Sequence, residues 1–178
     1  MSEAILEFFS GLPGELYVFI ISMLPIIELR GSIPVGAAIG LPFYTNYLLS
    51  ILGNMLPVPF ILLFIPKIFD FLARFKIFRP MVEWLKRKAE KKKSKVLVDG
   101  ETPVGERPRM SKKVFFALSL FVAIPLPGTG AWTGALVASL FRLSKRYSLL
   151  ATLIGVLLSG IIMTLASYGV VGFLKIFI

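Results

Sequence analysis

The chain has 178 residues, 56% of them hydrophobic, and a mean hydropathy of +0.83. This composition excludes a soluble globular protein, which needs more polar surface to cover its core, and it predicts a single membrane domain over residues 1–178. The chain has no cysteine and no histidine, which excludes disulfides and thiolate or imidazole metal sites. We expect no cofactor, no metal and no enzymatic activity, and any proton coupling must use a carboxylate.

The formal net charge is +10, and fifteen of the 20 Lys and Arg residues lie within residues 67–113. A basic block between apolar blocks is typical of a cytoplasmic loop that faces anionic lipid, and it argues against a nucleic-acid partner. Residues 68–85 show helical apolar spacing, which predicts an amphipathic helix on the cytoplasmic leaflet. The acidic N-terminus lacks the basic region of a signal peptide, so we expect no cleavage.

The first half of the chain contains an interrupted apolar segment and a long one. Residues 16–27 are apolar but too short to cross a bilayer, which takes roughly 20 residues. They lead into the polar sequence Glu28-Leu-Arg-Gly-Ser-Ile-Pro34, after which residues 35–41 are apolar again. Residues 44–66 are uncharged and long enough to span a membrane. This half therefore predicts a half-helix, a break, a half-helix and a spanning helix.

The second half repeats this order. Residues 114–124 lead into the break Pro125-Leu-Pro-Gly-Thr-Gly130, which is followed by a short apolar stretch over 131–141 and a long one over 147–174. Paired Gly/Pro-interrupted hydrophobic segments in two halves of a chain indicate a transporter-type binding site. We predict repeat one over 14–66, a cytoplasmic loop over 67–113 and repeat two over 114–174.

Two topologies fit this pattern. Each interrupted segment is either one kinked spanning helix, which gives a four-helix bundle, or a re-entrant hairpin that enters and leaves on the same side. With the basic loop in the cytoplasm, only hairpins place Arg142, Lys145 and Arg146 there as well, in accordance with the positive-inside rule. We favour an all-α fold of two inverted repeats, each a re-entrant hairpin plus one spanning helix, in a prokaryotic cell membrane with both termini outside. The two hairpin tips then meet near the midplane.

Glu28 and Arg30 are the only formal charges in the predicted inserted segments. A charge inside a bilayer costs at least about 2.5 kcal/mol and marks a functional site by default. Glu28 either neutralises Arg30 or takes up and releases a proton. The alternative is a salt bridge that only holds the hairpin tip.

Both breaks precede a half-helix, and we expect the first of these to begin near Pro34, since proline suits the first turn of a helix. Backbone N–H groups at such helix starts favour an anion, although Pro and Gly also break helices without any ligand. Asn54 is polar within the first spanning segment, where helix-to-helix contact is the alternative to substrate contact. The candidate substrate- or ion-binding residues are Glu28, Arg30, Gly31, Ser32, Pro34, Asn54, Pro127, Gly128, Thr129, Gly130 and Trp132.

The sequences Glu28-Leu-Arg-Gly-Ser-Ile-Pro-Val-Gly36 and Pro125-Leu-Pro-Gly-Thr-Gly-Ala-Trp-Thr-Gly134 resemble the two signatures of the small multidrug export family. The resemblance covers residues 16–172 and implies efflux of drug-like amphiphiles. The double-hairpin plan is similar to the DedA superfamily, which implies a lipid-phosphate substrate such as undecaprenyl phosphate. The chain lacks the extended DedA arginine motif, unless Arg142 fills that place.

We therefore predict a small secondary transporter, with Glu28 as the coupling carboxylate. A lipid-phosphate translocase is one alternative, and a non-transporting membrane scaffold that uses the basic loop is the other. Two spanning helices and two hairpins make a thin assembly whose polar tips need more protein around them, so we expect a homodimer or larger oligomer.

Overall fold

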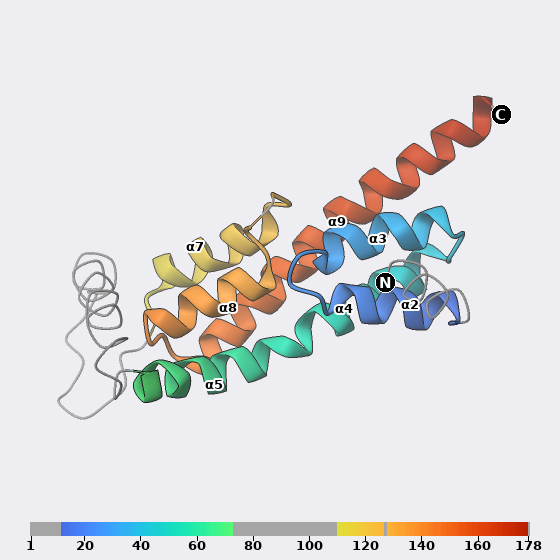
Figure 1. The fold of residues 1–178 in the computed structure, drawn as a ribbon. Helices are drawn as coiled ribbons and strands as arrows, with labels where there is room; N and C mark the ends of the chain where they lie inside the picture. Colours follow the sequence, from blue (N-terminus) through green and yellow to red (C-terminus); the bar gives the residue numbers. More distant parts are fainter. Residues whose placement is uncertain (1–11, 73–109, 127, 178) are drawn as a thin grey trace. The chain divides into compact units, whose positions relative to one another are not determined.

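The computed structural model describes residues 12–72, 110–126 and 128–177, and these ranges contain helices and short connections but no strand. The all-helical class predicted from the sequence is confirmed. The helices, shown in Figure 1, are α2 (Gly14–Ser22), α3 (Glu28–Ala38), α4 (Phe43–Met55), α5 (Pro57–Leu72), α7 (Lys112–Ala123), α8 (Ala131–Leu140) and α9 (Lys145–Phe177).

Two helical segments are long and apolar enough to cross a membrane. α4 and α5 together supply the segment Phe43–Ile68, and α9 supplies Lys145–Val170, each of 26 residues. Both exceed the roughly 20 residues that a crossing needs. The helices predicted over 44–66 and 147–174 are confirmed.

The chain folds into two compact units. Unit 1 comprises Met1–Leu56 and Val156–Ile178, and unit 2 comprises Pro57–Gly155. The boundaries fall inside the two long helical segments, so each unit contains one pair of short helices and part of both long segments. The repeats over 14–66 and 114–174 stay a prediction.

In unit 1, α2 and α3 lie side by side in opposite directions, and both pack against α4 (Figure 1). The hydroxyl of Tyr47 donates a hydrogen bond to the carbonyl of Leu157 (3.2 Å), and the hydroxyl of Tyr168 donates to the carbonyl of Leu41 (2.7 Å). Tyr47 follows Leu41 in the chain, but its partner Leu157 precedes Tyr168. α4 and α9 therefore run in opposite directions. Among the described residues of unit 1, the buried apolar side chains are Val18, Ile21, Leu29, Ile33, Ala37, Ile51 and Val156.

In unit 2, α7 and α8 form a second pair of short helices, and α8 packs against α5. The hydroxyl of Ser139 donates a hydrogen bond to the carbonyl of Ile61 (3.4 Å). Gly134 and Gly155 both lie against the side chain of Val122, which ties α7 to α8 and to the first part of α9. The absence of a side chain at the two glycines is what permits this close packing.

The first break lies earlier than the sequence predicts. The connection between α2 and α3 is formed by residues 23–27, and α3 begins at Glu28, so Pro34 lies inside the helix. The prediction that a half-helix begins near Pro34 is wrong, because a helix can accommodate an internal proline at the cost of one backbone hydrogen bond. The second break is confirmed, since α7 ends at Ala123 and α8 begins at Ala131.

Most of the predicted amphipathic helix over 68–85, and the basic run that follows it, lie outside the described residues. Within the described part, α5 continues to Leu72.

Candidate substrate and ion site

Glu28 is the first residue of α3 and is only 4% exposed. Its φ of 51° is left-handed, a conformation that costs a non-glycine residue about 1–3 kcal/mol and tends to persist at functional sites. Its backbone N–H donates to the carbonyl of Leu24 (2.9 Å), which closes the turn between the two short helices. Among the described residues of unit 1, the one buried carboxylate therefore lies at a strained hairpin corner.

Arg30 is half-buried and interacts electrostatically with Glu28. Residues two positions apart on a helix do not face each other. The arginine thus offsets part of the charge of Glu28.

Three buried polar residues, which we call the polar stripe, follow one face of α4: Asn46, Ser50 and Asn54. Their spacing of four residues places them on the same side of the helix. Ser32 on α3 donates a hydrogen bond to Ser50 (2.8 Å), and Ser50 donates to the amide oxygen of Asn46 (3.4 Å). The polar stripe is therefore the surface on which α3 is held.

Asn46 also connects α4 to two other segments of unit 1. Its amide nitrogen donates to the carbonyl of Ile33 (2.8 Å) and to the hydroxyl of Tyr168 on α9 (3.0 Å). Gly36 faces the same amide so closely that a Cβ would collide with it. Asn46 is thus a structural centre of unit 1.

Asn54 differs from the other two members of the polar stripe. Its side chain is 0% exposed, and neither its amide oxygen nor its amide nitrogen has a hydrogen-bond partner. Each unsatisfied buried polar group costs about 1–3 kcal/mol, so a native protein needs a reason to retain one.

Gly31, Ser32 and Pro34 lie within α3 and not before it. The backbone N–H of Gly31 donates to the carbonyl of Ile27 (3.0 Å) within the first turn. The N–H of Gly31 is therefore not open to an anion, and the first turn of α3 contains the acidic Glu28. The predicted anion-binding arrangement at this break is wrong, because the helix begins six residues before the expected position at Pro34.

In unit 2, Gly128 has a φ of 83°, which suits glycine because it lacks a Cβ. The hydroxyl of Thr129 donates to the carbonyls of Ile124 (2.7 Å) and Leu126 (2.8 Å). These residues thus show the chemistry of a tight turn. Gly130 is the buried residue before α8, with no side-chain cap.

Trp132 lies in the first turn of α8 and is half-buried, while Pro127 lies outside the described residues. The predicted site residues therefore separate into a unit 1 group and a unit 2 group. The unit 1 group is Glu28, Arg30, Gly31, Ser32, Pro34 and Asn54, and the unit 2 group is Gly128, Thr129, Gly130 and Trp132. That the two hairpin tips meet stays a prediction.

Sequence reasoning missed Asn46, Ser50 and Tyr168. The first two carry a readable signal, because polar residues recur every fourth position within an otherwise apolar spanning segment. Tyr168 carries no comparable signal, since aromatic residues are common in spanning helices.

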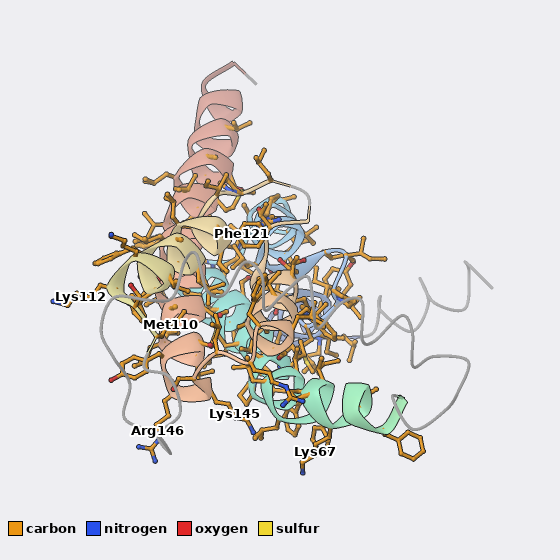
Figure 2. The ribbon with its side chains drawn as sticks, turned by 90° about the vertical axis from the view of Figure 1, so that its left-hand side faces the viewer. Lys67, Met110, Lys112, Phe121, Lys145 and Arg146 are labelled. Atoms are coloured by element: carbon orange, nitrogen blue, oxygen red, sulfur yellow. The ribbon has the colours of Figure 1, made fainter. Side chains whose placement is uncertain are left out.

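The turns that join the short helices are apolar. Ile26, in the first turn, is 95% exposed, and Leu126, in the second, is also exposed. The opposite ends of the unit 2 helices carry basic residues. Lys112 begins α7, and Lys145 and Arg146 begin α9 soon after α8 ends. In Figure 2, which faces this end of unit 2, these three residues and Lys67 lie around the edge of the view.

Comparison with known proteins gives one family. Neither the curated proteins nor the solved structures provide a match, and the similarity to the DedA superfamily stays an expectation. A family model matches residues 28–162, a range that begins at Glu28, includes the second break and covers well over half of the chain. The chain therefore belongs to the family described as "Putative small multi-drug export protein".

Proposed function

We propose that the chain is a small secondary transporter that exports drug-like amphiphiles, with Glu28 as the residue that couples transport to protons. The observation that carries this proposal is the burial of Glu28 at the corner of the first hairpin (4% exposed). A buried carboxylate in a membrane-inserted segment is expensive, and such residues mark ion and proton pathways.

The proposal takes each pair of short helices as a re-entrant hairpin, with the turn inside the bilayer. The exposed apolar side chains of Ile26 and Leu126 support this reading, because both would be unfavourable in water. The basic residues at the opposite end of unit 2 suit a cytoplasmic surface. A single kinked helix would instead place the start of α7 and the end of α8 on opposite sides.

The proposal also takes the two halves as inverted repeats, and the ends of α3 and α8 support this. At the end of α3, Leu41 N–H donates to Gly36 (2.9 Å), and Gly40 has a φ of 81°. At the end of α8, Leu143 N–H donates to Ala138 (2.9 Å), and Arg142 has a φ of 49°. Both ends form the same Schellman motif. Corresponding residues are separated by one constant spacing along the chain: Gly36 and Ala138, Gly40 and Arg142, Leu41 and Leu143.

Packing glycines follow the same spacing. Gly53 lies against Ser22 and the carbonyl of Phe19 on α2, and Gly155 lies against Val122 and the carbonyl of Ser119 on α7. Ser50, bonded to Ser32, corresponds in the same way to Thr152, which lies near Gly134. Since α4 and α9 run in opposite directions within unit 1, equivalent spanning helices would have opposite orientations, as inverted repeats require.

The lipid-phosphate alternative has less support than the sequence indicated. It depended on two helix starts that offer N–H groups to an anion. The start of α3 carries Glu28 in its first turn, and a carboxylate repels a phosphate. The start of α8 behind Gly130 is compatible with either substrate class.

A ligand-dependent melting experiment tests the substrate class. A ligand that binds only the folded state raises the melting temperature by mass action. We expect lipophilic cations to stabilise the purified protein at alkaline pH, and Glu28→Gln to remove this effect. Stabilisation by undecaprenyl phosphate that is lost in Arg30→Ala would reject the export proposal in favour of the lipid carrier. The absence of any shift with either ligand would favour the scaffold alternative.

We further propose a prokaryotic cell-membrane location, with residues 67–113 in the cytoplasm and both termini outside, and a homodimer or larger assembly. The exposed side chains in the two turns are apolar, so the turns themselves do not need other protein to shield them from lipid. The argument that remains for an oligomer is that two candidate spanning segments make a small membrane unit.

A further inference from the structure

Two contacts between α3 and α4 define how the helices are aligned. Gly36 lies against the amide of Asn46, and one helical turn earlier in α3, Ser32 is hydrogen-bonded to Ser50 at 2.8 Å. Each step of four residues back along α3 corresponds to a step of four residues forward along α4, because the two helices run in opposite directions.

The same alignment makes Glu28 and Asn54 the next pair. Glu28 precedes Ser32 by four residues, and Asn54 follows Ser50 by four. Both side chains are buried, at 4% and 0% exposure, and both atoms of the Asn54 amide group that can form hydrogen bonds lack a partner. The amide thus has one donor and one acceptor with no hydrogen-bond partner, and continuing the alignment by one step places it opposite the first residue of α3.

The protonation state of Glu28 decides whether its carboxyl group can form hydrogen bonds with both the nitrogen and the oxygen of the Asn54 amide. An ionised carboxylate only accepts hydrogen bonds, whereas a protonated carboxyl group donates one and accepts another. Only the protonated form can therefore satisfy both the nitrogen and the oxygen of Asn54, through two parallel hydrogen bonds. We infer that Asn54 is a positioning residue for proton coupling, which binds the protonated form of Glu28. This inference rests on the proposed function, in which Glu28 carries the coupled proton.

Arg30 interacts electrostatically with the ionised form of Glu28. On release of the proton, the carboxylate loses one of its two hydrogen bonds to Asn54 and keeps its attraction to Arg30. The other charged or titratable side chains described in unit 1 are Glu15 and Tyr17 on α2, Tyr44 and Tyr47 on α4, and Tyr168 on α9.

Infrared spectroscopy of the full-length protein in lipid tests this pairing, because it detects the carbonyl band of a protonated carboxyl group. The band that disappears in Glu28→Gln belongs to Glu28, and its intensity against pH gives a midpoint. We expect Asn54→Leu to lower this midpoint by about one pH unit, because the protonated form of Glu28 loses the two hydrogen bonds that favour it over the ionised form. Asn54→Ala provides the same test if the leucine variant does not fold.

Ser159→Ala is the matched control, because Ser159 is also a buried residue of unit 1 whose hydroxyl lacks a partner. We expect no change of the midpoint in this variant. An unchanged midpoint in both Asn54 variants, or an equal shift in Ser159→Ala, would overturn the inference. Transport is measured separately on the same samples. A midpoint that shifts as expected in a protein whose transport does not depend on Glu28 would retain the Glu28–Asn54 pair and reject the proposed function.

Discussion

The hydroxyl of Ser32 on α3 donates a buried hydrogen bond of 2.8 Å to the hydroxyl of Ser50 on α4. This bond joins the first hairpin to the first long helical segment, between the pair Gly36–Asn46 on one side and the residues Glu28 and Asn54 on the other. It therefore fixes the alignment on which the proton-binding inference depends.

We expect Ser32→Ala and Ser50→Ala each to lower stability by about 1 kcal/mol, because each removes a partner from a buried hydrogen bond. The double variant should lose less than the sum of the two, by roughly 0.6 kcal/mol, which is the average for such bonds in a membrane protein. Reversible unfolding in mixed micelles measures all three values. Additive losses would show that the bond contributes nothing to holding α3 on α4.

Gly53→Ala and Gly155→Ala should both destabilise the protein by about 1–3 kcal/mol, the usual cost of forcing extra atoms into a packed interior. At each position the new Cβ would meet a backbone carbonyl, which has little freedom to move. Gly169→Ala is the matched control, since nothing lies within 4 Å of its Cβ position. We expect it to be neutral or slightly stabilising, because alanine favours helix more than glycine does. A similar loss in all three variants would contradict the packing argument.

Tyr168→Phe should weaken the contact between α9 and α4 within unit 1. The tyrosine hydroxyl accepts a hydrogen bond from Asn46 and donates one to Leu41, so its removal leaves a buried amide donor with one partner fewer. We expect a loss of about 1 kcal/mol of stability with no change in ligand-induced stabilisation. Tyr44→Phe removes an exposed hydroxyl and serves as the control. If Tyr168→Phe were as stable as the wild type, the contact would have no energetic role.

The hairpin topology can be tested directly, because the chain contains no cysteine. Single cysteines at Lys113, near the start of α7, and at Lys145, the first residue of α9 after α8 ends, should react with a membrane-impermeant reagent from the same side. A cysteine at Ile68, exposed near the end of α5, should react from that side too. Reaction of positions 113 and 145 from opposite sides would mean that α7 and α8 cross the membrane.

The oligomer prediction has its own test. Cross-linking of the protein in native-like lipid should yield a species of at least twice the protomer mass. Bands at the mass of one protomer alone, at concentrations where the protein is active, would reject it.

The two breaks show why one part of the fold was predictable and another was not. Residues 125–130 combine prolines and glycines, and no helix continues through such a sequence, so the break appears where expected. The first break is formed by the mostly apolar residues 23–27, whereas the polar residues Glu28, Arg30 and Ser32 suggested a break and are in fact helical. Polar residues in an apolar segment predict irregular structure, but Ser32 is helical and donates a hydrogen bond to Ser50 on α4.

The candidate site was predictable to a similar extent. Glu28 and Asn54 could be selected because charge and amide groups are rare in apolar segments. The inferred pairing of Glu28 on α3 with Asn54 on α4 depends on the hydrogen bond between Ser32 and Ser50. That bond follows from the tertiary alignment of the two helices, which the sequence does not reveal. The left-handed conformation of Arg142 could not be predicted either, because glycine is the residue that normally signals this helix end.

The central claim is that Glu28 couples transport to protons, and flux in proteoliposomes tests it most directly. We would impose a pH gradient and follow the movement of a fluorescent lipophilic cation for the wild type, Glu28→Gln and Glu15→Gln. Glu15 is an exposed carboxylate on α2 and controls for the loss of one negative charge. The account predicts gradient-driven flux in the wild type and in Glu15→Gln, and its loss in Glu28→Gln. Gradient-driven flux of wild-type size in Glu28→Gln would contradict it.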